Sequence, residues 1–367
     1  MAAPLDRRQF LGRSLVAGAG FAAIGGTSGL LAACSSSSKS STTAGTTGGT
    51  GSGSLGAAKL QLSWVEDVEF AGEYIADSKG YYTQAGFSKM TLLAGGPSVN
   101  QDDVVASGQA LACISSPDIT AAKITKGADL ITVGAQYQKN PFCIMSLASS
   151  PLANPQAMIG KKIGVQSTNT AVWDSFLKAN NISQSQLTTV PVQFDPSGLV
   201  TGEVDGWFSF ITNEPIELHD QGHETTTFLL NDYNYPLVSE TYVVQTSSLT
   251  GAKRNQVKAL LKAEIMGWRD SLKDPTEGAT LAVNTYGKSQ KLNQTTEVEQ
   301  SKAQNKLILD SRTKTEGIFT VPNDLIAATV KTINESGTTI TASKLFDMSV
   351  LTEVYQENPS LMTDPTA

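Results

Sequence analysis

Short apolar runs alternate with amphipathic stretches from residue 60 to residue 246, and this rhythm limits the fold more than any other feature. The apolar runs predict strands at 60–65, 90–94, 110–115, 130–136, 142–147, 161–166, 189–194, 204–210, 226–230 and 241–246. The stretches between them predict helices at 71–79, 98–107, 118–125, 170–180, 198–202 and 214–221. This β-α-β order predicts an α/β fold of parallel sheets covered by helices.

Beyond residue 250 the sequence changes character and predicts mainly helices. An apolar stripe that includes Val257, Leu261 and Trp268 marks a helix over 251–271. Further helices are predicted near 274–286, 294–313 and 323–335.

The strand rhythm restarts after Pro151 and Pro155 and shifts again after Pro236. We therefore expect two doubly wound lobes, lobe I from 59–141 plus 242–367 and lobe II from 142–241, joined by two crossover strands. Such sheets bind ligands beyond the carboxyl ends of their strands, which predicts a ligand cleft between the lobes.

The amino-terminal end predicts export and a lipid anchor. Residues 1–33 have a twin-arginine stretch at Arg7-Arg8, a weakly apolar middle and a lipobox that ends at Cys34. The many glycines argue against the alternative, a transmembrane helix. Cys34 is the predicted lipidation site, and 34–58, rich in Ser, Thr and Gly, is a predicted tether. These features predict export by the twin-arginine pathway and a location on the outer face of the cytoplasmic membrane.

Charge excludes one class of partner. The chain beyond residue 33 keeps 24 Lys+Arg (27 less the three arginines before residue 34) and 33 Asp+Glu (34 less Asp6), a net charge of −9. An acidic protein of this kind is poorly suited to nucleic acid. We expect a monomer that binds a small molecule.

Polar and aromatic residues gather where the predicted strands end. The candidate ligand-binding residues are Trp64, Glu66, Glu69, Phe70, Tyr74, Gly96, Ser115, Ser116, Gln136, Ser167, Thr168, Asn169, Trp207, Asn213 and Glu214. Aromatic faces stack on planar ligands, and carboxylates accept from ring N–H or amino groups. Each residue has an alternative interpretation: Ser, Thr and Asn before helices are commonly caps, Trp173 and Trp207 could be core, and the glutamates could be solvated. Asn213 in particular resembles a helix N-cap, with Pro215 in the first turn.

Arginine is scarce, which bears on the charge of the ligand. Beyond residue 33 only Arg254, Arg269 and Arg312 occur, and none lies in a candidate loop. Anionic ligands are commonly held by bidentate arginine. The pattern therefore favours a neutral or weakly basic planar ligand.

Signals of catalysis are weak. His219 and His223 have i,i+4 spacing, but Gly222 interrupts the helix between them and no third metal ligand is evident, so a surface loop is expected. Cys113 and Cys143 lie in apolar runs and are expected to be buried free thiols, with a disulfide as the alternative. No catalytic residue, metal or cofactor is predicted.

Several motifs resemble those of a known family. Trp64 is followed by the run FAGEYIADSKGYY at 70–82, then by Ala94-Gly95-Gly96, by IGKKIGV at 159–165, and by Asn213-Glu214-Pro215. Over residues 59–250 this resembles the extracytoplasmic solute-binding proteins of ABC importers. It is most similar to the branch that binds thiamine-pyrimidine and riboflavin-type precursors, which is related to fungal thiamine-pyrimidine synthases. It is also similar to the sulfonate- and nitrate-binding group.

The resemblance implies a type II periplasmic-binding-protein fold, hinge closure on a small molecule and delivery to an ABC permease. It also implies that Trp64, the residues at 66–70 and Glu214 line the pocket. Two departures matter: Phe70 stands where the fungal synthases carry histidine, and there is no cysteine-rich iron-binding box. A binding protein for a planar heterocycle is therefore expected, with a binding protein for sulfonate- or nitrate-like anions, or an exported precursor-synthase-type enzyme, as alternatives.

Overall fold

The computed structural model describes residues 54–366, so the predicted signal peptide, Cys34 and nearly all of the tether lie outside the described residues. Ten strands form two five-stranded sheets. The first sheet has the order β2 (Lys89–Leu93), β1 (Ala57–Gln61), β3 (Ala112–Ser115), β10 (Ser239–Val244) and β4 (Ile131–Tyr137). The second has the order β7 (Thr188–Val192), β6 (Lys162–Gln166), β8 (Gly206–Phe210), β5 (Phe142–Leu147) and β9 (Thr225–Leu229).

All ten predicted strands exist, with ends that differ by up to four residues, but the sheets are not wholly parallel. β1 runs parallel to β2 and β3, and β6 runs parallel to β7 and β8. By contrast, β10 is antiparallel to β3 and β4, and β5 is antiparallel to β8 and β9. The chain passes from the first sheet to the second between β4 and β5, and returns between β9 and β10. β5 and β10, the first strands after these crossings, run antiparallel to their neighbours.

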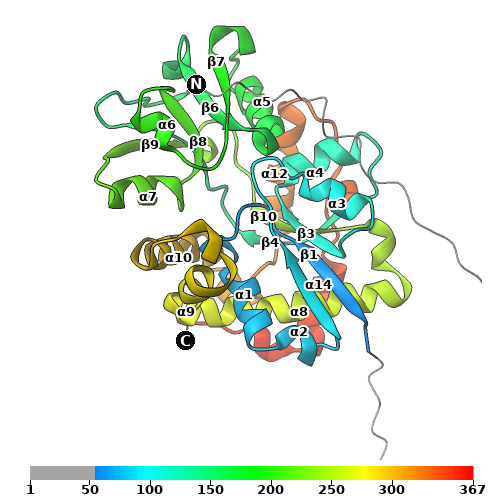
Figure 1. The fold of residues 1–367 in the computed structure, drawn as a ribbon. Coiled ribbons are helices and arrows are strands. Elements are labelled where there is room, and N and C mark those ends of the chain that lie inside the picture. The colour runs from blue at the N-terminus through cyan, green and yellow to red at the C-terminus, as the bar shows by residue number, and fades with distance from the viewer. Residues whose placement is uncertain (1–53, 367) are drawn as a thin grey trace, which may run out of the picture. The chain divides into compact units, whose positions relative to one another are not determined.

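Helices cover both sheets (Figure 1). The helices are α1 (Ala71–Ser78), α2 (Tyr81–Gln84), α3 (Gln101–Ala106), α4 (Pro117–Ile124), α5 (Thr170–Ala179), α6 (Ser197–Val200), α7 (Glu214–Asp220), α8 (Gly251–Lys273), α9 (Pro275–Leu281), α10 (Gln294–Ile308), α11 (Thr313–Glu316), α12 (Asn323–Glu335), α13 (Ala342–Leu345) and α14 (Ser349–Glu357). The predicted helix near 274–286 is split, because α9 gives way to a π-helical turn at Ala282–Tyr286. The sequence reasoning missed α2, α11, α13 and α14. No helix in the described part of the chain is long and apolar enough to span a membrane.

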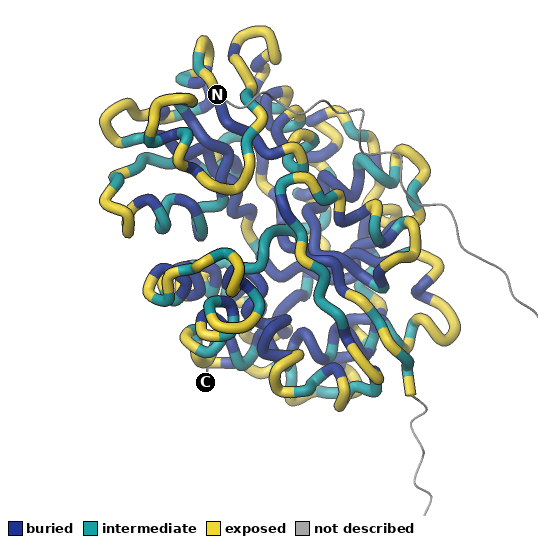
Figure 2. The backbone as a smooth tube through the Cα atoms, viewed as in Figure 1, coloured by how far each residue is buried: buried dark blue, intermediate teal, exposed yellow. Residues whose placement is uncertain are grey.

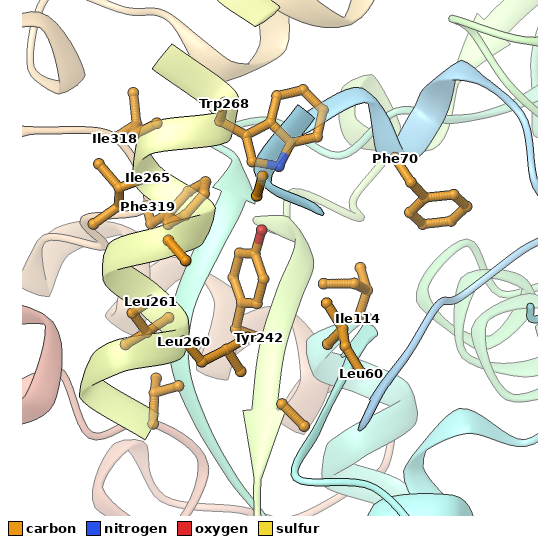
Figure 3. Close-up of a cluster of buried hydrophobic side chains, with 14 of the residues drawn as sticks. Leu60, Phe70, Ile114, Tyr242, Leu260, Leu261, Ile265, Trp268, Ile318 and Phe319 are labelled. Atoms are coloured by element: carbon orange, nitrogen blue, oxygen red, sulfur yellow. The ribbon is translucent and has the colours of Figure 1, made fainter. Parts of the chain in front are cut away.

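Each of the two sheets has its own apolar core. In Figure 2 the buried residues are the dark blue parts of the backbone tube. The larger core lies between the first sheet and α8, with Trp268, Tyr242 and Leu261 among its buried members (Figure 3). Close packing of α1 on α8 depends on glycine, since a Cβ at Gly267 would lie 2.1 Å from the carbonyl oxygen of Gly72. Burial of large apolar side chains supplies most of the stabilisation of such a core.

Candidate functional site

The loop after β1 is fixed by hydrogen bonds before it reaches any ligand. Asp67 Oδ1 accepts from the Glu69 N–H over 2.9 Å and so caps the 3-10 turn Val68–Phe70. From α10, Glu297 Oε2 accepts from the Val68 N–H over 2.8 Å, and the Gln304 amide donates to the Val68 carbonyl over 2.8 Å. The loop therefore presents Trp64 and Glu69 from a rigid base.

The loop after β3 holds two hydroxyl groups in fixed orientations. Ser115 Oγ donates to Asp102 Oδ2 over 2.5 Å, and Ser116 Oγ donates to Asp118 Oδ1 over 2.6 Å. The Tyr235 hydroxyl donates to the other oxygen of Asp118 over 2.5 Å. Because the proton of Ser116 is used internally, its lone pairs remain available as acceptors. Ser115 Oγ already accepts from the Gln101 amide over 3.4 Å.

The second sheet supplies the facing wall. Gln166, at the end of β6, donates to the Phe208 carbonyl over 3.0 Å, and the Asn169 amide donates to Gln166 Oε1 over 3.1 Å. The hydroxyl of Thr168 has no partner in the described part of the chain. Gln166 is thereby locked by its neighbours, whereas Thr168 can still bond to a ligand.

Glu214 follows β8 and is buried at the first turn of α7. Its Oε2 accepts from Ser209 Oγ over 2.6 Å and from the Phe210 N–H over 3.1 Å. Burial raises the pKa of Glu214 to about 7, in spite of these hydrogen bonds, which lower it. Near neutral pH this carboxyl group can either donate or accept.

These loops enclose a cavity with an empty volume of about 520 Å³ at the carboxyl ends of β1, β3, β6 and β8. Its lining residues are Ser63, Trp64, Glu69, Gln101, Ser115, Ser116, Ile119, Phe142, Gln166, Thr168, Asn169, Phe208, Ser209, Phe210, Asn213, Glu214 and Glu240. Four of them are aromatic and three are glutamates, and no lysine or arginine lines the cavity in residues 54–366. The aromatic walls of this cavity suit a planar ligand.

A second, larger cavity of about 960 Å³ adjoins the first and shares Trp64, Asn213 and Glu214 with it. We call it the vestibule. It is lined from α7 and α10 by acidic residues, including Glu217 and Glu297. Burial raises the pKa of Glu217 and raises that of Glu297 to about 8.

The structure brings eight of the predicted ligand-binding residues to the cavity. They are Trp64, Glu69, Ser115, Ser116, Thr168, Asn169, Asn213 and Glu214. Asn213 was also expected to cap α7 with its side chain, and this is wrong: its amide forms no cap and instead donates to Asp67 Oδ2 over 3.1 Å.

Three of the predicted aromatic residues do not line the cavity, because tertiary packing buries their rings in the cores. Phe70 is fully buried in the larger core, and Tyr74 stacks on Tyr286 with ring centroids 4.2 Å apart. Trp207 is 1% exposed and packs in a cluster with Met145. Side chains alternate across a strand, so Trp207 faces away from the cavity while its neighbour Phe208 lines it.

Four further predicted residues do not line the cavity. Ser167 is exposed at the start of a 3-10 turn, and Glu66 is half-buried, which raises its pKa. Gly96 begins a turn with φ 141°, and a close approach of the backbone to Leu62 and Trp64 occurs at the preceding Gly95. Gln136 is buried in β4, and neither of its side-chain polar atoms has a partner in the described structure.

Sequence reasoning missed Ser63, Gln101, Phe142, Phe208, Phe210 and, above all, Glu240. Glu240 lies in the buried strand β10 with φ 47°, a region that L-residues seldom adopt. The sequence did carry one signal of this residue, namely a carboxylate in a strand that is otherwise largely apolar. Strained backbone of this kind is frequent at functional sites.

Residues considered for other chemistry lie elsewhere. His219 Nδ1 lies 3.3 Å from Glu224 Oε1 on the surface. In residues 54–366 no cluster of three or more His, Cys, Asp or Glu side chains is arranged to hold a metal. Cys113 and Cys143 are buried and unpaired, as expected, and burial raises the pKa of both thiols.

Comparison with solved structures supports the fold. The chain is similar to the periplasmic aliphatic sulphonate binding protein SsuA from Escherichia coli, with a TM-score of 0.56 and 14% identity over 76% of this chain and 85% of that one. It is also similar to the periplasmic nitrate-binding protein NrtA from Synechocystis PCC 6803, with a TM-score of 0.58 and 12% identity over 84% of this chain and 92% of that one. The predicted periplasmic-binding-protein fold is confirmed.

Comparison of sequences finds a protein of higher sequence identity than these structures. The chain is 26% identical to the riboflavin-binding protein RibY of Chloroflexus aurantiacus over 242 residues, which are 63% of this chain and 67% of that protein. Residues 67–278 match the family described as NMT1/THI5 like. This match spans more than half of the chain and confirms the resemblance seen in the motifs: the protein belongs to the NMT1/THI5-like family.

Proposed function

We propose that this protein is the solute-binding subunit of an ABC importer and that it captures a neutral or weakly basic planar heterocycle, such as an aminopyrimidine or a flavin-like compound. The observation that carries the proposal is the lining of the cavity, where aromatic rings and carboxyl groups surround the space without a basic side chain. Relatives support the transport role, because the curated relative is named for riboflavin binding and the structural neighbours are named as periplasmic binding proteins.

The ligand would lie between Trp64 of the first wall and Phe142, Phe208 and Phe210 of the second. Offset or edge-to-face contacts with these rings would hold a planar ring system. Glu69, Glu214 and Glu240 would bond to its N–H or amino groups, and Ser116 would accept from a further donor. Closure of the two sheets, with their covering helices, about the segments that connect them would bury the ligand.

Sulfonate or nitrate is the weaker candidate. An anion in this cavity would lie among three carboxyl groups with no arginine or lysine in the lining to compensate its charge. An enzyme of the precursor-synthase type is also weaker, since Phe70 replaces the histidine of that pattern and is buried in the core.

A thermal-shift panel tests the proposal. Riboflavin, lumichrome and a hydroxymethyl-aminopyrimidine should include a ligand that raises the melting temperature, because binding to the native state stabilises it. Taurine and nitrate should have no effect. Trp64→Ala should reduce the shift, whereas Ile159→Ala, at an exposed site outside the cavity, should not. A shift with taurine or nitrate alone would overturn the assignment of the ligand class.

Export through the twin-arginine pathway, lipidation at Cys34 and docking of a monomer on permease subunits complete the proposal. It rests on the amino-terminal sequence and on the roles of the named relatives. Cys34→Ser should move the protein from the membrane fraction to the soluble fraction of its host. Retention of the variant in the membrane would refute the lipid anchor.

A further inference from the structure

Two glutamates in the cavity share a single hydroxyl group. Ser63 Oγ lies 2.9 Å from Glu69 Oε1 and 3.0 Å from Glu240 Oε2. A serine hydroxyl has one hydrogen and can donate to only one of these oxygens. The other contact is a hydrogen bond only if that carboxyl group is protonated and donates to Ser63. We call Glu69 and Glu240, bridged by Ser63, the carboxyl dyad.

The surroundings keep one proton on the dyad. Glu69 and Glu240 are 8% and 3% exposed, and the titratable groups that face them are Asp67, Glu73, Glu214 and Tyr137. None of these can carry a positive charge. Burial, followed by repulsion from neighbouring carboxylates, raises the pKa of Glu69 well above its usual value, and burial raises that of Glu240 to about 8. Two adjacent carboxyl groups in such a place do not both ionise at neutral pH.

The strand register places a buried amide without partners next to the dyad. The pairs Ser239 with Tyr137 and Thr241 with Ala135 place Glu240 opposite Gln136 in the register of β10 and β4. The Gln136 side chain is 1% exposed and both its polar atoms lack partners in the described structure. Buried amides are normally satisfied, so this one marks a place where a bonding partner is missing. The φ of 47° at Glu240 shows that the backbone is held in strain there.

We propose that the carboxyl dyad determines ligand specificity. It would recognise a ligand that has a hydrogen-bond acceptor next to a hydrogen-bond donor on one edge. The carbonyl and N–H of a lactam form such an edge, and so do the ring nitrogen and amino group of an aminopyrimidine. The protonated carboxyl donates to the acceptor, and the carboxylate accepts from the donor. This inference rests on the proposed function and defines which edge of the heterocycle enters the cavity.

The dyad gives ligand binding a distinctive pH dependence. When its proton is lost, it offers only acceptors, and the ligand's carbonyl or ring nitrogen faces a carboxylate. Affinity should therefore be constant below the pKa of Glu240, about 8, and fall above it by roughly tenfold per pH unit. Glu240→Gln supplies an N–H donor and a carbonyl acceptor at every pH, so it should bind with a flat pH profile.

Riboflavin and lumichrome titrations by fluorescence quenching between about pH 6 and about pH 9 test this inference. Wild type and Glu203→Gln, a change at an exposed residue outside the cavity, should lose affinity above about pH 8. Glu240→Gln should keep affinity within about threefold of wild type at low pH and lose none at high pH, and Glu240→Ala should bind at least tenfold more weakly.

The outcomes separate the two proposals. A flat wild-type profile, or a wild-type slope that persists in Glu240→Gln, would overturn the role of the dyad and leave the binding function intact. No binding of either flavin at any pH, together with a thermal shift from taurine or nitrate, would overturn both.

Discussion

The side-chain amide of Asn213 donates a hydrogen bond to Asp67 Oδ2 over 3.1 Å, and it joins the loop after β8 to the loop after β1. From α10, the Gln300 amide donates to Asn213 Oδ1 over 2.9 Å. Asp67 is buried, which raises its pKa to about 7. The residue that sequence reasoning treated as a helix cap therefore links the two walls of the cavity at the border of the vestibule.

Loss of this link should favour the open arrangement of the two sheets. We expect Asn213→Ala to weaken the closed state by about 1 kcal/mol, the usual contribution of one hydrogen bond, and to reduce ligand affinity by about fivefold. Small-angle scattering of the ligand-free variant should give a larger radius of gyration than wild type. Asn231→Ala, which removes only a local bond to Asp232, serves as the control. An unchanged radius with unchanged affinity would refute the role of the link.

Trp64 and Trp207 should respond to truncation in opposite ways. Trp64 is half-buried and lines both cavities, so Trp64→Ala should reduce ligand affinity by about tenfold or more with a small effect on stability. Trp207 is buried beside Met145, so Trp207→Ala should lower the free energy of unfolding by about 3–5 kcal/mol. Urea unfolding and ligand titration together separate the two effects. If Trp207→Ala unfolds like wild type but fails to bind, Trp207 belongs to the site and not to the core.

A buried carboxyl pair should make the stability of the protein fall as pH rises. Glu73 Oε1 accepts from the Tyr242 hydroxyl over 2.9 Å and from the Trp268 N–H over 3.2 Å, while Tyr82 donates to Glu264 Oε1 over 2.6 Å. Burial raises the pKa of Glu73 to about 7. A carboxyl with a raised pKa in the folded state favours folding while it is protonated. Its stabilisation is complete below the unfolded pKa, near 4.5, and is lost as pH rises through about 7.

Urea unfolding at about pH 5.5 and about pH 8.5 measures this dependence. Glu73→Gln keeps a carbonyl acceptor for Tyr242 and Trp268 but cannot ionise, so the difference in unfolding free energy between the two pH values should shrink. Glu203→Gln, at an exposed position, should leave the difference unchanged. An equally large difference in Glu73→Gln would show that this pair does not govern the pH dependence.

The two cysteines should be inert in the native protein. Cys113 and Cys143 are fully buried, and burial raises the pKa of each thiol. The thiolate is the reactive form, so iodoacetamide should label neither residue until the chain is unfolded. Mass spectrometry of the region beyond residue 53 after native labelling should find no adduct. Rapid modification of either thiol would mean that the core around it opens readily.

Much of the fold followed from local sequence pattern. The apolar runs located every strand, and glycine, proline and polar residues located most helix ends, because these signals act over a few residues. The same loops yielded eight residues of the cavity. The sequence pattern failed to predict the burial of side chains that pack against distant parts of the chain. Phe70 and Tyr74 sit in the predicted loop and helix, yet the helices beyond residue 250 bury them.

Single-residue register was a second source of error. Trp207 and Phe208 are adjacent aromatic residues on a strand buried on both faces, so alternation could not say which ring faces the ligand. Glu240 was missed for a related reason, since its strand was identified but its place opposite Gln136, beside Ser63, depends on the pairing of β10 with β4 and on the loop after β1. Both facts required the three-dimensional arrangement of the two sheets.

Mass spectrometry of small molecules released from protein purified from its native host tests the central claim most directly. The account predicts a neutral or weakly basic planar heterocycle that carries a donor beside an acceptor, bound in proportion to protein and absent from Trp64→Ala prepared in the same way. Release of an alkanesulfonate, nitrate or another anion from the wild-type protein would contradict it.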